Sequence, residues 1–179
     1  MGKKPETFFT DLVSFKKWYN IDWHKNEMRI FGTDEYVPNP EFDKIFHAGY
    51  DPMIRLFPWT SEVLKKLSEK YTLAVLSSST KTSVESSLGD LSRYFSFIIG
   101  SKEVHFLKPN PEGVLLALKL SDTPANEALM IGDMNVDFLA GKNAGIKTGM
   151  VFWGLGEKEE LLALCADYYF ERYEELLGV

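Results

Sequence analysis

The sequence predicts an α/β protein, with a Rossmann-like parallel sheet and crossover helices preceded by a small helical cap segment. From Phe57 onward, patterns typical of helices and of strands alternate, as expected when crossover helices join parallel strands. Short apolar runs at 71–76, 128–131 and 148–152 have the character of strands. Before Asn39 the chain is instead rich in aromatic residues within a helical pattern.

The first third of the chain differs from the rest in its pattern of apolar residues. Apolar residues recur there at helical spacing: Phe8, Leu12, Phe15 and Tyr19. A break with two prolines follows at 36–40, and a second helical pattern covers 42–53. We therefore expect a helical cap-like segment at 1–55 and an α/β core at 56–179.

Bulk properties exclude several classes of partner. The 179 residues allow one α/β core with a small appendage, and the net charge of −6 argues against nucleic acid and anionic membranes. Cys165 is the only cysteine, so no intrachain disulfide is expected. No apolar run approaches the roughly 20 residues that span a bilayer, and the N-terminus lacks the apolar core of a signal peptide. We expect a cytoplasmic protein; the absence of glutamine favours a thermophilic source.

The first strand of the core is expected at 71–76, within the alternation of helix and strand that begins at Phe57. The strand ends in three serines and a threonine at 77–80, which open another helical pattern. Hydroxyl and backbone N–H groups at a helix N-terminus can bind an anion, which makes Ser77 and Ser78 candidate phosphate ligands. The alternative is an ordinary Ser/Thr N-cap.

A lysine lies about thirty residues farther along, at 108. Pro109 disfavours a helical conformation for Lys108, which we expect to be extended, and a helical pattern begins at Glu112. A lysine held in this way can act as a point charge for phosphate. The alternative is a solvated helix start.

Two aspartates follow the strand-like run at 128–131. Gly132 allows the backbone to turn, Asp133 lies in the turn, and Asp137 falls in the first turn of the next helix. Ligands bind at the carboxyl ends of strands in such sheets, and two neighbouring carboxylates are costly unless they share a cation or a proton. The pattern predicts a Mg²⁺ site, with a strand-to-helix cap as the alternative.

The order of strand-Ser, Lys-Pro and strand-Gly-Asp-x-x-x-Asp resembles the haloacid dehalogenase superfamily, and within it the phosphoglycolate-phosphatase-like branch. The resemblance covers about 57–179, and 166–170 with 174–177 look like the family's last strand and closing helix. It implies that Ser77 binds the transferring phosphoryl group and that Lys108 stabilises it.

The same resemblance implies the metal site and the reaction. Asp133 would ligate Mg²⁺ and Asp137 would hold or orient the metal shell, with Lys108 and Asp133 as the catalytic residues. Ser77, Ser78 and Lys108 would hold the phosphate of a small phosphorylated metabolite. The implied activity is a Mg²⁺-dependent phosphatase-type hydrolysis of small phosphate monoesters. The alternative is a catalytically inactive phosphate- or partner-binding domain.

One departure from the family pattern is important. The family's aspartate nucleophile follows an N-terminal strand in a D-x-D-x-T motif, which this sequence lacks. Asp11 and Asp34 are degenerate candidates, and Asp11 fits a cap helix better. We expect the chain to begin inside the cap, which leaves two strand edges unpaired in the middle of the sheet. The run at 28–31, a second chain in a homodimer, or sequence not shown could fill this gap.

Overall fold

The computed structural model describes residues 25–26, 28–29, 32–35, 37, 39, 41, 56–57 and 59–179. The chain divides into two compact units, Met1–Pro52 and Met53–Val179. Most of the predicted cap-like segment, with Asp11 and the helical pattern at 42–53, lies outside the described residues. The helical character of 1–55 as a whole therefore stays a prediction.

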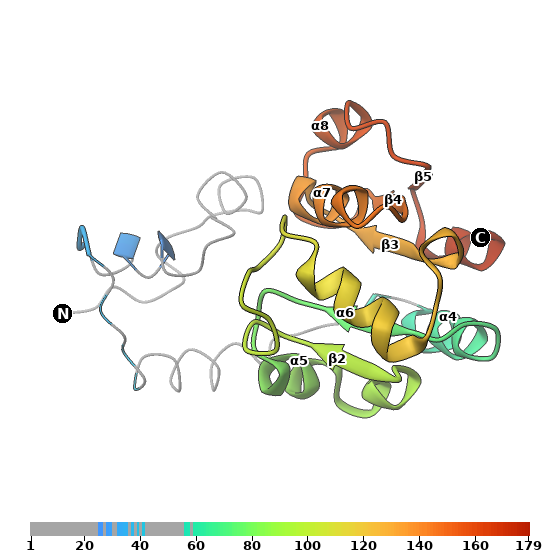
Figure 1. Ribbon diagram of the computed structural model, residues 1–179, viewed down its shortest axis with the longest axis horizontal. Helices are drawn as coiled ribbons and strands as arrows, with labels where there is room; N and C mark the ends of the chain where they lie inside the picture. The colour runs from blue at the N-terminus through green and yellow to red at the C-terminus, as the bar shows by residue number, and fades with distance from the viewer. Residues whose placement is uncertain are drawn as a thin grey trace. The chain divides into compact units, whose positions relative to one another are not determined.

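The second unit alternates helices and strands (Figure 1). In chain order it contains α4 (Thr60–Ser68), β1 (Ala74–Leu76), α5 (Lys81–Leu88), η3 (Gly89–Tyr94), β2 (Phe97–Ile99), α6 (Glu112–Ser121), η4 (Ala125–Glu127), β3 (Leu129–Gly132), α7 (Asn135–Asn143), β4 (Lys147–Val151), α8 (Lys158–Leu162), β5 (Tyr168–Phe170) and η5 (Tyr173–Gly178). The predicted strands and crossover helices are confirmed, and β2 and α8 are additional to them. None of the described helices is long and apolar enough to cross a membrane.

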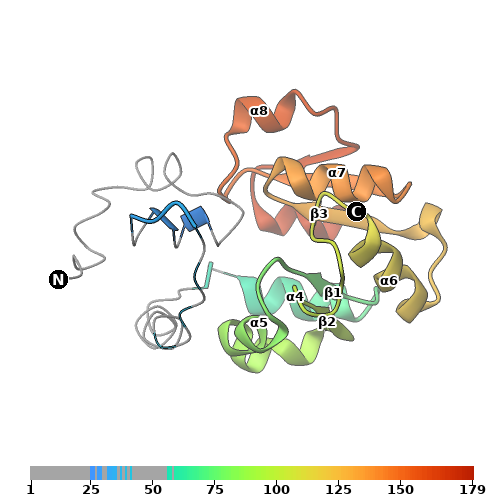
Figure 2. The same ribbon diagram turned by 60° about the vertical axis from the view of Figure 1, so that its left-hand side comes forward.

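The strands form two separate parallel sheets. One has the order β1-β2 and the other has the order β3-β4-β5. Ala74 pairs with Phe97 in the first sheet, and Ile131 pairs with Gly149 in the second. Figures 1 and 2 show α5 beside β2, and α7 beside β3 and β4. All of the pairing is parallel, which is the arrangement predicted for strands joined by helices.

A single apolar cluster joins the two sheets. Its buried members are Val114 of α6, Ala140 of α7 and Ile146. Leu76 of β1 and Met130 of β3 both pack against this cluster, so strands from different sheets rest on the same helical layer. The apolar positions of α6 and α7 thus hold β1 and β3 at fixed places although these strands do not pair with each other.

The strands that face the break between the sheets are the least buried. Ala74 is exposed, and Ile131 of β3 is 36% exposed, whereas 148–151 of β4 are buried. The predicted gap next to 71–76 and 128–131 is therefore present in the described part of the chain. The suggestion that 28–31 fills it as a strand is wrong for Met28 and Arg29, which are helical.

Away from the gap between the two sheets, the carboxylate of Asp167 links β4 to β5. Asp167 directly precedes β5 and accepts hydrogen bonds from Thr148 of β4. Thr148 is buried, and its N–H and hydroxyl donate to Asp167 Oδ2 at 2.8 and 3.2 Å. The hydrogen bond from the Thr148 N–H is the main cause that lowers the pKa of Asp167. Folding lowers the pKa of Asp167, so its ionised carboxylate stabilises the folded state. This stabilisation is complete at pH values above the pKa of Asp167 in the unfolded chain. It is lost as the pH falls through the lower pKa of Asp167 in the folded chain.

We therefore expect Asp167→Asn to reduce the free energy of unfolding near neutral pH by less than about 1 kcal/mol, because Asp167 is exposed and water screens its charge. The difference from wild type should shrink as pH falls below about 4 and should vanish once both chains carry a neutral side chain. Urea titrations across this pH range measure it. A difference that stays constant down to the most acidic sample would contradict the assignment.

Candidate active site at the open sheet edge

The turn after β3 folds the Asp137 side chain back over its own backbone. Asp137 Oδ2 accepts hydrogen bonds from the backbone N–H groups of Asp133 and Met134, at 3.1 and 3.0 Å. Gly132 makes this possible, because a Cβ atom at this position would lie 2.1 Å from the Asp137 Cβ. Asp137 is 4% exposed and satisfies the N–H groups at the start of α7. The capping interpretation thus describes part of what Asp137 does.

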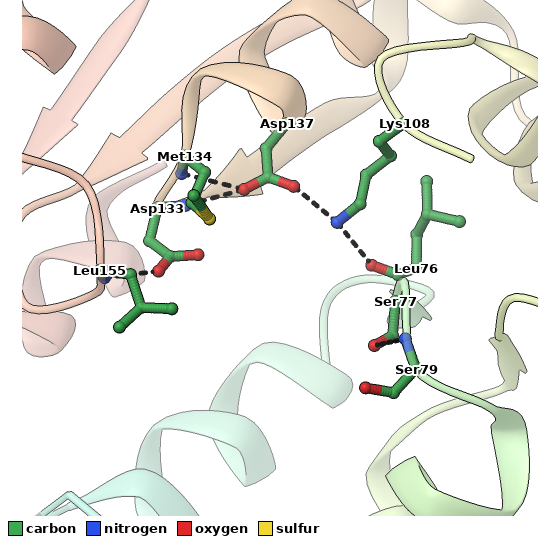
Figure 3. Close-up of polar contacts among 8 residues, drawn as sticks. All are labelled: Leu76, Ser77, Ser79, Lys108, Asp133, Met134, Asp137 and Leu155. Carbon is green, nitrogen blue, oxygen red and sulfur yellow. Dashed lines mark hydrogen bonds and ion pairs between the residues drawn. The ribbon is translucent and has the colours of Figure 1, made fainter. Parts of the chain in front are cut away.

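Lys108 supplies the cation that the buried Asp137 carboxylate needs. The Lys108 Nζ lies 2.6 Å from Asp137 Oδ1, and the two side chains are 13% and 6% exposed. The same ammonium donates to the Leu76 carbonyl oxygen at 3.2 Å (Figure 3). One cation thereby joins the carboxyl end of β1 to the turn after β3. Two neighbouring carboxylates were expected to share a cation or a proton, and for Asp137 the structure provides a lysine.

Asp133 has a different environment from Asp137. Its Oδ2 accepts the Leu155 N–H at 2.7 Å, and its backbone oxygen accepts the Gly156 N–H at 3.0 Å (Figure 3). Cβ atoms at positions 154 and 156 would lie 2.2 Å from the Asp133 Cβ and backbone oxygen, respectively, so glycines are required there. No hydrogen bond reaches Asp133 Oδ1 from the described residues. This oxygen is the carboxylate position that can meet a ligand.

Ser77 lies directly after β1, next to the carbonyl that Lys108 contacts (Figure 3). Its hydroxyl oxygen accepts the Ser79 N–H at 3.1 Å, which leaves the hydroxyl hydrogen available to donate. Ser78 follows and is half-buried. The N-cap of α5 is Thr80, whose side chain accepts the Ser83 N–H at 3.3 Å. The capping role therefore belongs to Thr80 and not to Ser77.

Lys108 lies in a turn that begins at Leu107. Asn110 donates its N–H to the Leu107 carbonyl at 3.0 Å, so Lys108 and Pro109 occupy the two central positions of the turn. The peptide bond between them is cis, as in turns with proline at the third position. Asn143 of α7 donates to the Pro109 carbonyl at 3.1 Å, which anchors the turn beside the acidic pair.

Glu112 orders the segment that leads to this turn. Its carboxylate accepts the N–H groups of His105 and Phe106, at 3.0 and 2.8 Å, and these bonds lower the pKa of Glu112. The role of Glu112 was not predicted, although its place in the first turn of α6 is a recognisable signal. The side chain of His105 is 90% exposed.

The carboxylate oxygens at this site could supply only some of the ligands that a Mg²⁺ ion needs. Among the described residues, no group of three or more His, Cys, Asp or Glu side chains could hold a metal ion. Mg²⁺ usually keeps several waters and takes one or two carboxylates together with substrate phosphate oxygens. Asp133 could be one of these carboxylate ligands, since its Oδ1 has no partner among the described residues. Asp137 uses both oxygens for Lys108 and backbone N–H groups, so a metal role for it stays a prediction.

The described residues do not identify the nucleophile among its two candidates. Asp11 lies outside the described residues, and Asp34 is exposed in a bend of the first unit. No described strand precedes Asp34, so it does not reproduce the strand-Asp arrangement that made it a candidate. Within the described ranges, no strand pairs with the edges of β1 and β3 next to Lys108 and Asp133.

An acidic turn, a lysine and a hydroxyl thus lie at the carboxyl ends of parallel strands, which is where α/β sheets bind their ligands. Residues 17–151 match the haloacid dehalogenase-like hydrolase family, and the chain belongs to this family. The predicted family membership and fold class are thereby confirmed.

Individual relatives agree with this assignment. The pyrophosphatase PpaX of Bacillus cereus strain B4264 is 29% identical over 141 residues, which are 77% of this chain and 65% of PpaX. The structure of CbbY from Rhodobacter sphaeroides in complex with phosphate superimposes with a TM-score of 0.74 at 19% identity, covering 94% of this chain and 81% of CbbY. A protein of Lactobacillus plantarum, provisionally assigned as a phosphoglycolate phosphatase, has a TM-score of 0.70 at 19% identity over 96% of this chain and 82% of its own.

Proposed function

We propose that this protein binds the phosphate group of a small phosphorylated metabolite in the cytoplasm and serves Mg²⁺-dependent hydrolysis of the monoester. The observation that carries the proposal is the position of the Lys108 ammonium. It lies within hydrogen-bond distance of both Leu76 and Asp137, beside the Ser77 hydroxyl. A phosphate placed there would meet a fixed positive charge and hydroxyl donors at one sheet edge.

Each residue has a separate task in this proposal. Lys108 and the hydroxyls of Ser77 and Ser78 would hold phosphoryl oxygens while charge redistributes during transfer. Asp133 would hold Mg²⁺ through its unpartnered oxygen, and the bound ion would neutralise phosphate charge. Asp137 positions Lys108 and the Asp133 backbone, because it contacts both. Leu155 and the glycines beside it keep Asp133 in one orientation.

A second function has support of its own. The described residues place no aspartate on a strand between β1 and β3, where the family's covalent chemistry would begin. A domain with the phosphate and metal groups but without a nucleophile would bind phosphate or a partner and would not hydrolyse. This alternative predicts ligand binding without turnover.

Calorimetric titration with Mg²⁺ and inorganic phosphate tests the site. We expect wild type to bind one Mg²⁺ weakly and Asp133→Asn to lose this binding, because the variant replaces the carboxylate of the acidic pair that keeps an oxygen free of described partners. Asp122→Asn is the matched control, since Asp122 lies at the opposite end of α6 from the Lys108 loop. Equal Mg²⁺ titrations of wild type and Asp133→Asn would contradict the metal assignment.

Turnover of p-nitrophenyl phosphate separates the two functions. Without a nucleophile, hydrolysis should be near background even when Mg²⁺ and phosphate bind, because the covalent step supplies many decades of rate. Robust turnover would favour the hydrolase. Turnover that disappears in Asp11→Asn would identify Asp11 as the nucleophile and would overturn its assignment to a cap helix.

A further inference from the structure

A groove lies between α4 and η5, which pack against each other in the second unit (Figure 1). Its volume is about 360 Å³, which is within the range of small-molecule sites. Side chains at helical spacing line it, because residues three or four apart share one face of a helix. The lining residues are Trp59, Glu62, Val63, Lys66, Glu174 and Leu177. None of them belongs to the candidate active site.

Trp59 has a backbone conformation that glycine adopts more easily. Its φ of 67° and ψ of −2° lie in the left-handed region, where a bulky side chain is uncommon and strained. Trp59 is nevertheless 61% exposed, and no ring in the described part of the chain packs against its indole. Because glycine would relieve the strain and the indole adds little to the core, the ring is available to contact a ligand.

One carboxylate of the groove has no cation to neutralise it. The Lys66 Nζ lies 2.6 Å from Glu62 Oε1, so these two charges offset each other. Glu174 is exposed and has neither an ion pair nor a hydrogen-bond donor among the residues that the structure describes. Val63 is 4% exposed and Leu177 is half-buried, so the floor between the charges is apolar. The groove therefore combines an exposed indole, an apolar floor and a net negative charge.

We propose that this groove binds a small organic cation, an ammonium or guanidinium group carried on an apolar body. The cation lies against the Trp59 indole, whose ring face attracts positive charge, and beside the Glu174 carboxylate. The apolar body covers Val63 and Leu177 and removes their surface from water. An anionic ligand would be repelled by Glu174. The inference rests on α4 and η5 alone and is independent of the proposed function.

An NMR titration of the full chain with three related probes tests the groove. The probes are phenethylammonium, neutral phenethyl alcohol and the hydrocinnamate anion, which share a phenyl body and differ in charge. We expect phenethylammonium to shift the indole N–H signal of Trp59 and the methyl signals of Val63 and Leu177. It should bind at least about threefold more tightly than the alcohol, and hydrocinnamate should bind most weakly.

Two variants separate binding from folding. Trp59→Gly relieves the left-handed strain, so it should melt at the wild-type temperature or above it and yet bind phenethylammonium at least about tenfold more weakly. Glu174→Gln keeps the shape of the side chain and removes its charge, so the ammonium probe should lose its advantage over the alcohol. Glu127→Gln is the matched control, since Glu127 is exposed on η4 and does not line the groove.

Equal affinities of the wild type for the ammonium and alcohol probes would overturn the proposal, as would binding that Trp59→Gly leaves intact. If Glu174→Gln and Glu127→Gln weaken the ammonium probe equally, the attraction comes from the net negative charge of the protein and not from the groove. Signals of Trp59 that no probe shifts would also overturn the proposal. Sedimentation would then show whether a second copy of the chain covers the groove.

Discussion

Replacing Lys108 by methionine is expected to lower the free energy of unfolding by about 2–4 kcal/mol. The Asp137 carboxylate is 6% exposed and would lose its only cation among the described residues, keeping two backbone N–H donors. Methionine matches the length of the lysine stem, so the loss reports mainly the unpaired charge. Urea unfolding of both chains measures the difference.

Lys66→Met is the matched control for this result. Lys66 also lies 2.6 Å from a carboxylate, that of Glu62, but the two side chains are 51% and 49% exposed. Such a surface pair contributes about 0.5 kcal/mol or less. If Lys108→Met and Lys66→Met cost the same, the Lys108 pair is not the buried link between the two sheets. Lys108→Met should also weaken binding of inorganic phosphate, whereas Lys66→Met should leave it unchanged.

Gly132→Ala is expected to cost about 2–3 kcal/mol, because relief of an overpacked site requires displacement of the backbone. The added Cβ would lie 2.1 Å from the Asp137 Cβ, which is attached directly to α7 and cannot rotate away. Relief requires moving the first turn of α7 from β3, and this movement would stretch the bonds from Asp133 and Met134 to Asp137. Denaturant unfolding and Mg²⁺ titration should therefore both change.

Gly178→Ala makes the same chemical change where a Cβ would meet nothing within 4 Å. We expect its stability to stay within about 0.5 kcal/mol of wild type, as for most surface substitutions. A Gly132→Ala chain as stable as Gly178→Ala, with unchanged Mg²⁺ binding, would show that the turn tolerates a side chain. The close approach of Asp137 to the glycine would then not be required.

The local motifs could be predicted because their physics is local. An apolar run followed by Gly132 and Asp133 indicates the end of a strand, and parallel strands place such ends at the same edge. Strand ends therefore place Ser77 and Asp133 at one edge of the sheet, and the resemblance to the family adds Lys108. The sequence also lacks the family's motif for a central strand, and in the part of the chain that the structure describes no strand lies between β1 and β3.

Other parts of the site depend on contacts between distant segments. Gly154 and Gly156 show no dinucleotide-binding pattern, and their role as neighbours of Asp133 appears only when the segment after β4 returns to the turn after β3. The ordering of the Lys108 loop by Glu112 depends on side-chain direction in the same way. Spacing alone does not reveal such close approaches.

The sequence by itself determined the α/β class, because hydrophobic periodicity is encoded by near neighbours. The resemblance of its ordered motifs to a known family indicated the family and the residue types expected at the sheet edge. Only the tertiary structure decided which cation and which hydrogen-bond donors each carboxylate and hydroxyl of the site contacts. It paired Asp137 with Lys108, left an oxygen of Asp133 open among the described residues, and gave the N-cap to Thr80 instead of Ser77. These choices depend on distances between segments far apart in the chain, where a shift of about an ångström separates a hydrogen bond from no contact.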